Sequence, residues 1–166
     1  MMHRLLSTFD KAFGFDTAQA HCDIPCKIYE PQVAIVAALS VIRLMDLIAE
    51  LEANETLTLS QQATLARLVA EKETHAKKVK DEVTTIWGDY FKQPQFAAFP
   101  DTSELVHQIM LAGSACKQHI DRDKGVALLE LVNELAKRFW ETKNITTFTA
   151  PCPYPPALPV VYPKLV

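Results

Sequence analysis

The sequence has few glycines and lacks the glycine-rich motifs that bind phosphate. Only 4 of its 166 residues are glycine, against 10 prolines, and neither GxxxxGK[ST] nor GxGxxG occurs. These motifs bring backbone N–H groups close to a phosphate, so their absence argues against a nucleotide-binding loop. A basic excess is also missing, because 17 Lys and Arg face 20 Asp and Glu, for a net charge of −3. We therefore expect no nucleic-acid partner.

Targeting and membrane-spanning runs are also missing. The first 20 residues contain Arg4 and two leucines but no continuous apolar run, which argues against a Sec-type signal peptide. The uncharged run 32–42 is followed by Arg43 and Asp46, so it is too short to span a membrane. With 49% hydrophobic and 22% charged residues, the chain has the composition of one soluble domain. We expect a cytoplasmic protein with no membrane partner.

Cysteines are scarce, and two of the four lie close together. They are Cys22, Cys26, Cys116 and Cys152. An even number allows a two-disulfide secreted domain, but this chain is longer and more helical than such scaffolds. Cys22 and Cys26 also follow a histidine directly, which favours metal binding by that pair. Cys116 lies on a helical stretch and is expected to be a small buried hydrophobe, whereas Cys152 receives no role.

The segment HCDIPCKIYEP, residues 21–31, is the most informative one present. Pro25 lies between the two thiols and can bend the chain so that both sulfurs approach one point. Thr17-Ala18-Gln19-Ala20 directly upstream fits the small-residue pattern of a processing site. Cleavage after Ala20 would give His21 a free α-amine. That amine, the His21 imidazole, the two thiolates and a deprotonated backbone amide would form a mixed N/S site for one transition metal.

The rest of the chain predicts an all-α fold, an antiparallel four-helix bundle with an N-terminal metal-binding hook. Thr58 and Gln61 have capping-box spacing, and Asp101 with Glu104 is a candidate cap for a later helix. Asp121 or Asp123 is expected to cap the last one. The predicted helices span Pro31–Leu51, Leu59–Tyr90, Thr102–His119 and from Asp121 or Asp123 to about Lys143.

Three regions outside the apolar faces complete the predicted organisation. The second helix carries a charged run that we expect to be a solvated face, namely Glu71, Lys72, Glu73, Lys77, Lys78, Lys80, Asp81 and Glu82. Pro94 and Pro100 mark a connector. The tail 146–166 holds 6 of the 10 prolines, and we expect it to be extended, either draped on a neighbour or disordered. The predicted division is a removable leader 1–20, a hook 21–30, a bundle 31–145 and a proline-rich tail 146–166.

The hook resembles the N-terminal metal hook of the nickel superoxide dismutases. WGDYFK at 87–92 and FWETK at 139–143 are similar to later motifs of that family, in the same order. The resemblance covers 21–143 and leaves out the tail. It implies an oxidoreductase that disproportionates superoxide to dioxygen and hydrogen peroxide by one-electron cycling of one nickel ion per chain. It also implies a leader-processing protease and a homohexamer.

The same resemblance implies roles for individual residues. The ligands would be the amine and imidazole of His21, the amide nitrogen and sulfur of Cys22, and the sulfur of Cys26. Tyr29 would lie over the open face of the metal and limit access, and Asp23 would order the hook. The remaining residues that we single out are Asp89 and Tyr90, expected to receive the hook, and Trp87, Phe91, Phe139 and Trp140, expected in the core.

Two lysines and two departures from the family pattern also bear on the site. Lys27 stands where the family often has glycine, and we hypothesise that Lys27 and Lys92 attract superoxide electrostatically. The family commonly pairs the hook imidazole with a glutamate backed by an arginine. Ala37 and His75 occupy those positions here, so the partner of the His21 imidazole is open.

Three other readings compete with a dismutase. His21, Cys22 and Cys26 would also suit zinc or copper in a non-catalytic metal-binding module. Glu104 and His107 form one Glu-x-x-His pair of the kind found in di-iron bundles, but no second pair exists. A helical interaction module with oxidised cysteines is the third possibility.

Overall fold

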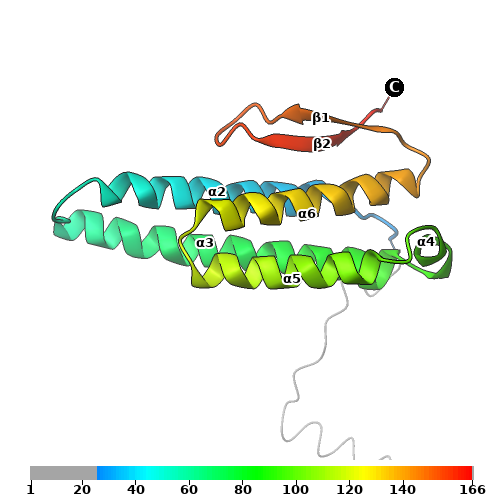
Figure 1. Ribbon diagram of the computed structural model, residues 1–166, viewed down its shortest axis with the longest axis horizontal. Coiled ribbons are helices and arrows are strands. Elements are labelled where there is room, and N and C mark those ends of the chain that lie inside the picture. The colour runs from blue at the N-terminus through cyan, green and yellow to red at the C-terminus, as the bar shows by residue number, and fades with distance from the viewer. Residues whose placement is uncertain (1–25, 166) are drawn as a thin grey trace, which may run out of the picture.

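In the computed structural model, which describes residues 26–165, each of four long helices runs antiparallel to the two helices that it packs along (Figure 1). They are α2 (Gln32–Glu52), α3 (Leu59–Thr85), α5 (Thr102–Gln118) and α6 (Arg122–Glu141). α2 packs along α3 and α6, and α5 packs along the same two helices, so the four close into a bundle. The predicted all-α bundle is confirmed. The leader and the hook residues up to Pro25 lie outside the described residues.

Side-chain caps explain where two of these helices begin. The Thr58 hydroxyl accepts a hydrogen bond from the Gln61 N–H (3.3 Å), and the Gln61 side chain accepts one from the Thr58 N–H (2.9 Å). This is the predicted capping box. At the start of α6, the Asp121 carboxylate accepts a bond from the Asp123 N–H (3.1 Å), as the sequence also predicted.

The predicted cap at Asp101 is wrong. Within the described residues its side chain makes no cap bond to α5. Both carboxylate oxygens instead accept bonds from the Arg138 guanidinium, at 2.8 and 3.0 Å. A bidentate, charge-assisted ion pair is stronger than a single hydrogen bond to a backbone amide, and α6 brings Arg138 within reach of Asp101. This pairing holds the pKa of Asp101 below its ordinary value.

α2 is buried on several sides, as its composition indicates. Ala34, Ile35, Ala38, Val41 and Ile42 are each at most 1% exposed. Gly125 lets α6 approach closely, since a Cβ there would lie 2.8 Å from Cγ1 of Ile42. By length and composition α2 is the candidate membrane span among the described residues, with mean hydropathy 1.9. Half of that stretch is buried in the bundle, and core helices of soluble proteins pass the same test.

The charged run on α3 is not solvated throughout, because Lys72 is only 1% exposed. Its Nζ donates to the carbonyl oxygens of Cys116 (2.6 Å), Lys117 (2.8 Å) and His119 (3.1 Å). The last carbonyls of a helix lack intrahelical donors, and α5 ends opposite Lys72. The prediction of a solvated face is therefore wrong at Lys72, whereas Lys77, Lys78 and Asp81 are exposed as expected.

The connector after α3 contains a short helix that the sequence did not predict. α4 spans Gln93–Ala98 at one end of the bundle, with Pro94 in its first turn (Figure 1). The Gln95 side chain accepts a bond from the Lys92 N–H (3.1 Å), which secures the start of α4.

The proline-rich tail is an ordered hairpin. β1 (Thr147–Pro151) pairs antiparallel with β2 (Pro159–Pro163), with Phe148 opposite Tyr162 and Ala150 opposite Val160. The expected extended backbone is confirmed for these strands. The expectation of disorder is wrong, because the hairpin packs on α6 of its own chain (Figure 1). Cys152 and Val160 are 3% and 0% exposed, so apolar burial stabilises this placement.

Candidate functional site

The second motif, WGDYFK, forms a π-helical turn at the end of α3. This turn, η1, spans Ile86–Tyr90, and the Phe91 N–H bonds to the Ile86 carbonyl oxygen (3.2 Å). Such wide turns are rare and often mark functional positions, because they shift the side chains that follow. Here the turn leaves Gly88 and Asp89 exposed while Tyr90 is half-buried.

Tyr90 is where the three motifs meet. Its ring lies 5.7 Å from the ring of Tyr29 in the hook segment and 4.7 Å from that of Phe139 in FWETK. The Tyr90 hydroxyl is 2.5 Å from Oγ1 of Thr142 in the same motif. Aromatic pairs at these separations stabilise a fold beyond the free energy gained by burying their rings. The hook segment is therefore attached to the bundle through its tyrosine.

The direction of the Tyr90 hydrogen bond follows from its neighbour. The Thr142 hydroxyl donates its single proton to the Phe139 carbonyl oxygen (2.6 Å). A threonine hydroxyl has one proton and two acceptor lone pairs. The Tyr90 hydroxyl must then donate to Thr142, which fixes the orientation of the phenol.

Lys143 places a positive charge beside this cluster. Its Nζ lies 4.9 Å from the ring centroids of both Tyr90 and Phe139, within the range of cation–π attraction. The side chain is exposed. Thr142 and Lys143 belong to the FWETK motif, yet sequence reasoning gave neither of them a role. Only their membership of the motif could have drawn attention to them.

The described end of the hook begins at Cys26, which is exposed. Lys27 follows with φ 59°, in the left-handed region that glycine occupies without strain and other side chains occupy at a cost of about 1–2 kcal/mol. This explains why glycine suits the position. Glu30 then accepts a bond from the Gln32 N–H (3.0 Å), so α2 begins directly after the hook.

The predicted ligand set is only partly within the described residues. His21, Cys22 and Asp23 lie outside them, whereas Cys26 and Tyr29 lie inside. In the described part of the chain, no group of three or more His, Cys, Asp or Glu side chains is positioned to hold a metal. The ligand assignments and the role of Asp23 therefore stay predictions.

Most of the predicted aromatic core is confirmed. Phe91, Phe139 and Trp140 are 2%, 0% and 9% exposed. Trp87 is an exception, since it is 36% exposed and its indole N–H donates to Oγ of Ser103 (3.2 Å).

The two departures from the family pattern lie side by side. Ala37 on α2 and His75 on α3 line one cavity of about 230 Å³ near the first turn of α2. Nδ1 of His75 is buried, and no hydrogen-bond partner for it exists among residues 26–165. The partner of the His21 imidazole remains open.

The described residues do not support the di-iron interpretation or a disulfide between the two later cysteines. Glu104 and His107 are both exposed, and Glu104 accepts a bond from Gln108, so this pair does not face the bundle core. Cys116 and Cys152 are buried thiols outside any disulfide of the described chain. Burial raises the pKa of the Cys116 thiol to about 11, so it stays protonated at neutral pH and is a poor metal ligand.

Comparison with known proteins identifies the family. The model of the nickel-containing superoxide dismutases matches residues 16–143. The superoxide dismutase [Ni] of Streptomyces seoulensis is 36% identical over 75% of this chain and 89% of its own length. The Streptomyces coelicolor superoxide dismutase [Ni] is 35% identical over 77% of this chain and 92% of its own length. A native nickel superoxide dismutase structure superimposes with a TM-score of 0.66 at 34% identity, covering 75% of this chain and 99% of that one.

These matches favour a dismutase over a non-catalytic zinc or copper module, and they span all three sequence motifs. The chain belongs to the nickel-containing superoxide dismutase family.

Proposed function

We propose that this nickel-dependent superoxide dismutase builds its metal site from the N-terminal hook after its leader is removed. The observation that carries the proposal is the convergence at Tyr90. Tyr90 of WGDYFK contacts Tyr29 and is itself bound to Thr142 of FWETK, and Tyr29 lies three residues after Cys26. A bundle that fixes the hook segment by its tyrosine leaves the Cys26 thiol at the surface, where an ion and a small substrate can reach it.

The proposed ligands are the His21 amine and imidazole, the Cys22 amide nitrogen and sulfur, and the Cys26 sulfur. Their donor chemistry fits nickel, because thiolates and a deprotonated amide stabilise its higher oxidation state. The thiols must lose their protons on binding, so acid should oppose metal loading. Bound nickel supplies the one-electron cycling that the reaction needs.

The reaction balances with two superoxide anions and two protons. One anion loses an electron and leaves as dioxygen, and the second gains that electron and two protons to become hydrogen peroxide. In our proposal the Tyr29 phenol limits the space beside the metal and holds water or a small oxyanion. Asp23 orders the hook around that space. Tyr90 positions Tyr29 through ring contact and is itself fixed by Thr142.

Positive charges around the hook favour an anionic substrate even though the chain is acidic overall. Lys27 lies two residues before Tyr29 in the chain, Lys143 Nζ lies 4.9 Å from the Tyr90 ring, and Lys92 donates to the Gly88 carbonyl oxygen (2.9 Å) at the π-helical turn. We propose that these three lysines raise the association rate of superoxide.

The steering proposal predicts a loss of salt dependence. Lys27→Asn, Lys92→Gln and Lys143→Gln together should lower kcat/KM about threefold to tenfold at low ionic strength and flatten its decrease with added salt. Asparagine is chosen at Lys27 because it tolerates a positive φ. Pulse radiolysis at several salt concentrations measures the effect. Lys117→Gln, a change of an exposed lysine on α5, is the control. An unchanged salt slope in the triple variant would rule out steering by these lysines.

We also propose that the chain works as a homohexamer, that a dedicated protease removes residues 1–20, and that the enzyme is cytoplasmic. The apolar α2, with Val33 and Val36 on its surface 36% and 43% exposed, supports contacts between subunits.

One preparation tests the proposed function. Mass spectrometry of the active enzyme should find His21 as the first residue, and metal analysis should find about one nickel per chain. Superoxide consumption should appear only in processed protein, since an intact leader leaves no amine at His21. An active enzyme that still begins at Met1, or one that holds zinc alone, would contradict the proposal.

A further inference from the structure

The C-terminal hairpin lies outside the part of the chain that is shared with the family. The family match ends at residue 143, before β1 begins. The native solved relative is covered over 99% of its length by only 75% of this chain, so its bundle folds without a counterpart of the hairpin. The hairpin is therefore an addition to the bundle of the family. Its role can be inferred from the surface of the bundle that it covers.

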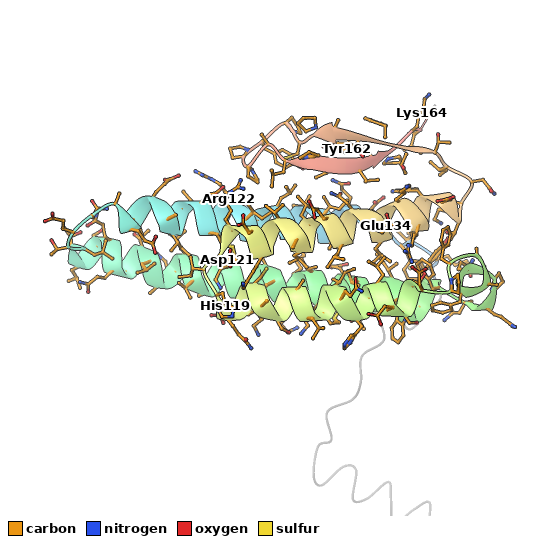
Figure 2. All side chains as sticks on the ribbon, in the orientation of Figure 1. His119, Asp121, Arg122, Glu134, Tyr162 and Lys164 are labelled. Atoms are coloured by element: carbon orange, nitrogen blue, oxygen red, sulfur yellow. The ribbon has the colours of Figure 1, made fainter. Side chains whose placement is uncertain are left out.

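The covered face belongs mainly to α6. Asn133 of α6 holds the outer edge of β2 with both ends of its side-chain amide. Its Nδ2 donates to the Pro159 carbonyl oxygen (3.1 Å), and its Oδ1 accepts from the Val161 N–H (3.0 Å). A side chain thus takes the place of a neighbouring strand. Figure 2 shows the strand carrying Tyr162 lying along α6, on which Glu134 is labelled.

α6 carries two apolar stripes where a surface helix usually carries one. The first faces the bundle core and consists of Leu128, Val132, Leu135 and Phe139. The second contains Leu129, Ala136 and Trp140, which share the face of Asn133 by helical spacing and are 2%, 0% and 9% exposed. β2 lies against this side of α6, where Asn133 binds it, so a bundle without the hairpin would lose part of the cover over the second stripe.

The hairpin also reaches α2, and its exterior carries the half-exposed ring of Phe148 beside residues that oppose further strand pairing. Tyr154 and Pro155 in its turn line a cavity of about 350 Å³ with Val36, Leu39 and Leu44. Prolines stand at Pro151, Pro159 and Pro163, and they cannot donate to a further strand. The exposed Lys164 follows β2. Prolines and lysines at strand edges discourage pairing with other sheets.

We propose that the hairpin is an intramolecular cover for a self-association surface, namely the Leu129, Asn133, Ala136 and Trp140 face of α6, and that the partner it excludes is a second copy of this chain. An apolar stripe on α6 that is left bare gains free energy from any matching apolar surface. A second copy brings the same stripe, so two bare stripes can bury each other about a twofold axis. The hairpin supplies that burial within one chain.

The test compares the assembly of two forms of the enzyme. Removing residues 145–166 should leave the bundle folded, as in the relatives, and should make the chain associate further than the full chain does. We expect the dissociation constant of the added association to fall about tenfold or more, measured by light scattering over a concentration series. Leu129→Lys in the truncated chain should restore the mass of the full chain. The comparison needs no activity and no assumed number of subunits.

Two results would overturn the proposal. One is a truncated chain with full helical circular dichroism and the same mass as the full chain at every concentration. If truncation instead unfolds the bundle, Asn133→Ala in the full chain decides. This substitution removes both hydrogen bonds to β2, so it should speed amide exchange in 159–163 and raise self-association. The control Asn54→Ala, at an exposed site after α2, should change neither. Faster exchange without added association would equally overturn it.

Discussion

Replacing Cys26 with serine is expected to remove bound nickel and to lower superoxide dismutation more than a hundredfold. Loss of a group that only supports a metal ligand costs about 10- to 100-fold, so loss of a ligand must exceed that range. A serine hydroxyl is a far weaker donor than a thiolate and does not stabilise oxidised nickel. Metal analysis and pulse radiolysis on the same preparation measure both effects.

The chain offers a matched control for that change. Cys152→Ser alters a thiol that is 3% exposed and donates to the Tyr154 carbonyl oxygen at 3.2 Å, a bond that serine can keep. Nickel content and activity should then stay within about twofold of the unmodified enzyme, because Cys152 lies in the hairpin outside the shared family region. Equal losses in both variants would show that thiol removal acts through folding. Full activity in Cys26→Ser would remove Cys26 from the ligand set.

Replacing Lys72 with methionine is expected to destabilise the bundle by about 2–4 kcal/mol. Methionine keeps the apolar stem but removes a donor that meets all three carbonyl oxygens at the end of α5. Those oxygens would then be desolvated without partners. For a domain of this size the melting temperature should fall by about 5–15 °C, measured by circular dichroism.

Lys78→Met is the control for the stability measurement, because Lys78 lies on the same helix but is exposed. It should change the free energy of unfolding by less than about 0.5 kcal/mol. If both variants melt together, the three carbonyl contacts contribute nothing to stability.

The pH dependence supplies a second check on Lys72. Burial lowers its pKa below the ordinary 10.5, with Glu73 opposing the shift. Between the lowered pKa and 10.5 the unfolded chain binds more protons than the folded one, so this group makes stability rise with pH. The stability gap between the unmodified protein and Lys72→Met should therefore widen from neutral pH toward 10.5.

Local sequence determined the helices and the chemistry of the hook. The Thr58–Gln61 capping box, the Asp121 cap and the apolar periodicity all act within a few residues, so they can be read along the chain. The two closely spaced thiols after a histidine are likewise a local pattern. Together with the two later motifs, they were sufficient to predict the family and its metal.

Only the tertiary structure decided which side chains meet across elements. Lys72 reads as one charge among many on α3, and it is buried only because α5 ends beside it. Asp101 has the spacing of a cap, yet Arg138 on a distant helix binds it. Tyr29, Tyr90 and Thr142 are far apart in the chain, and the packing of three elements brings them into contact. The hairpin is bound to α6 through Asn133. This contact is non-local, so it forms only because the fold places β2 opposite that side chain.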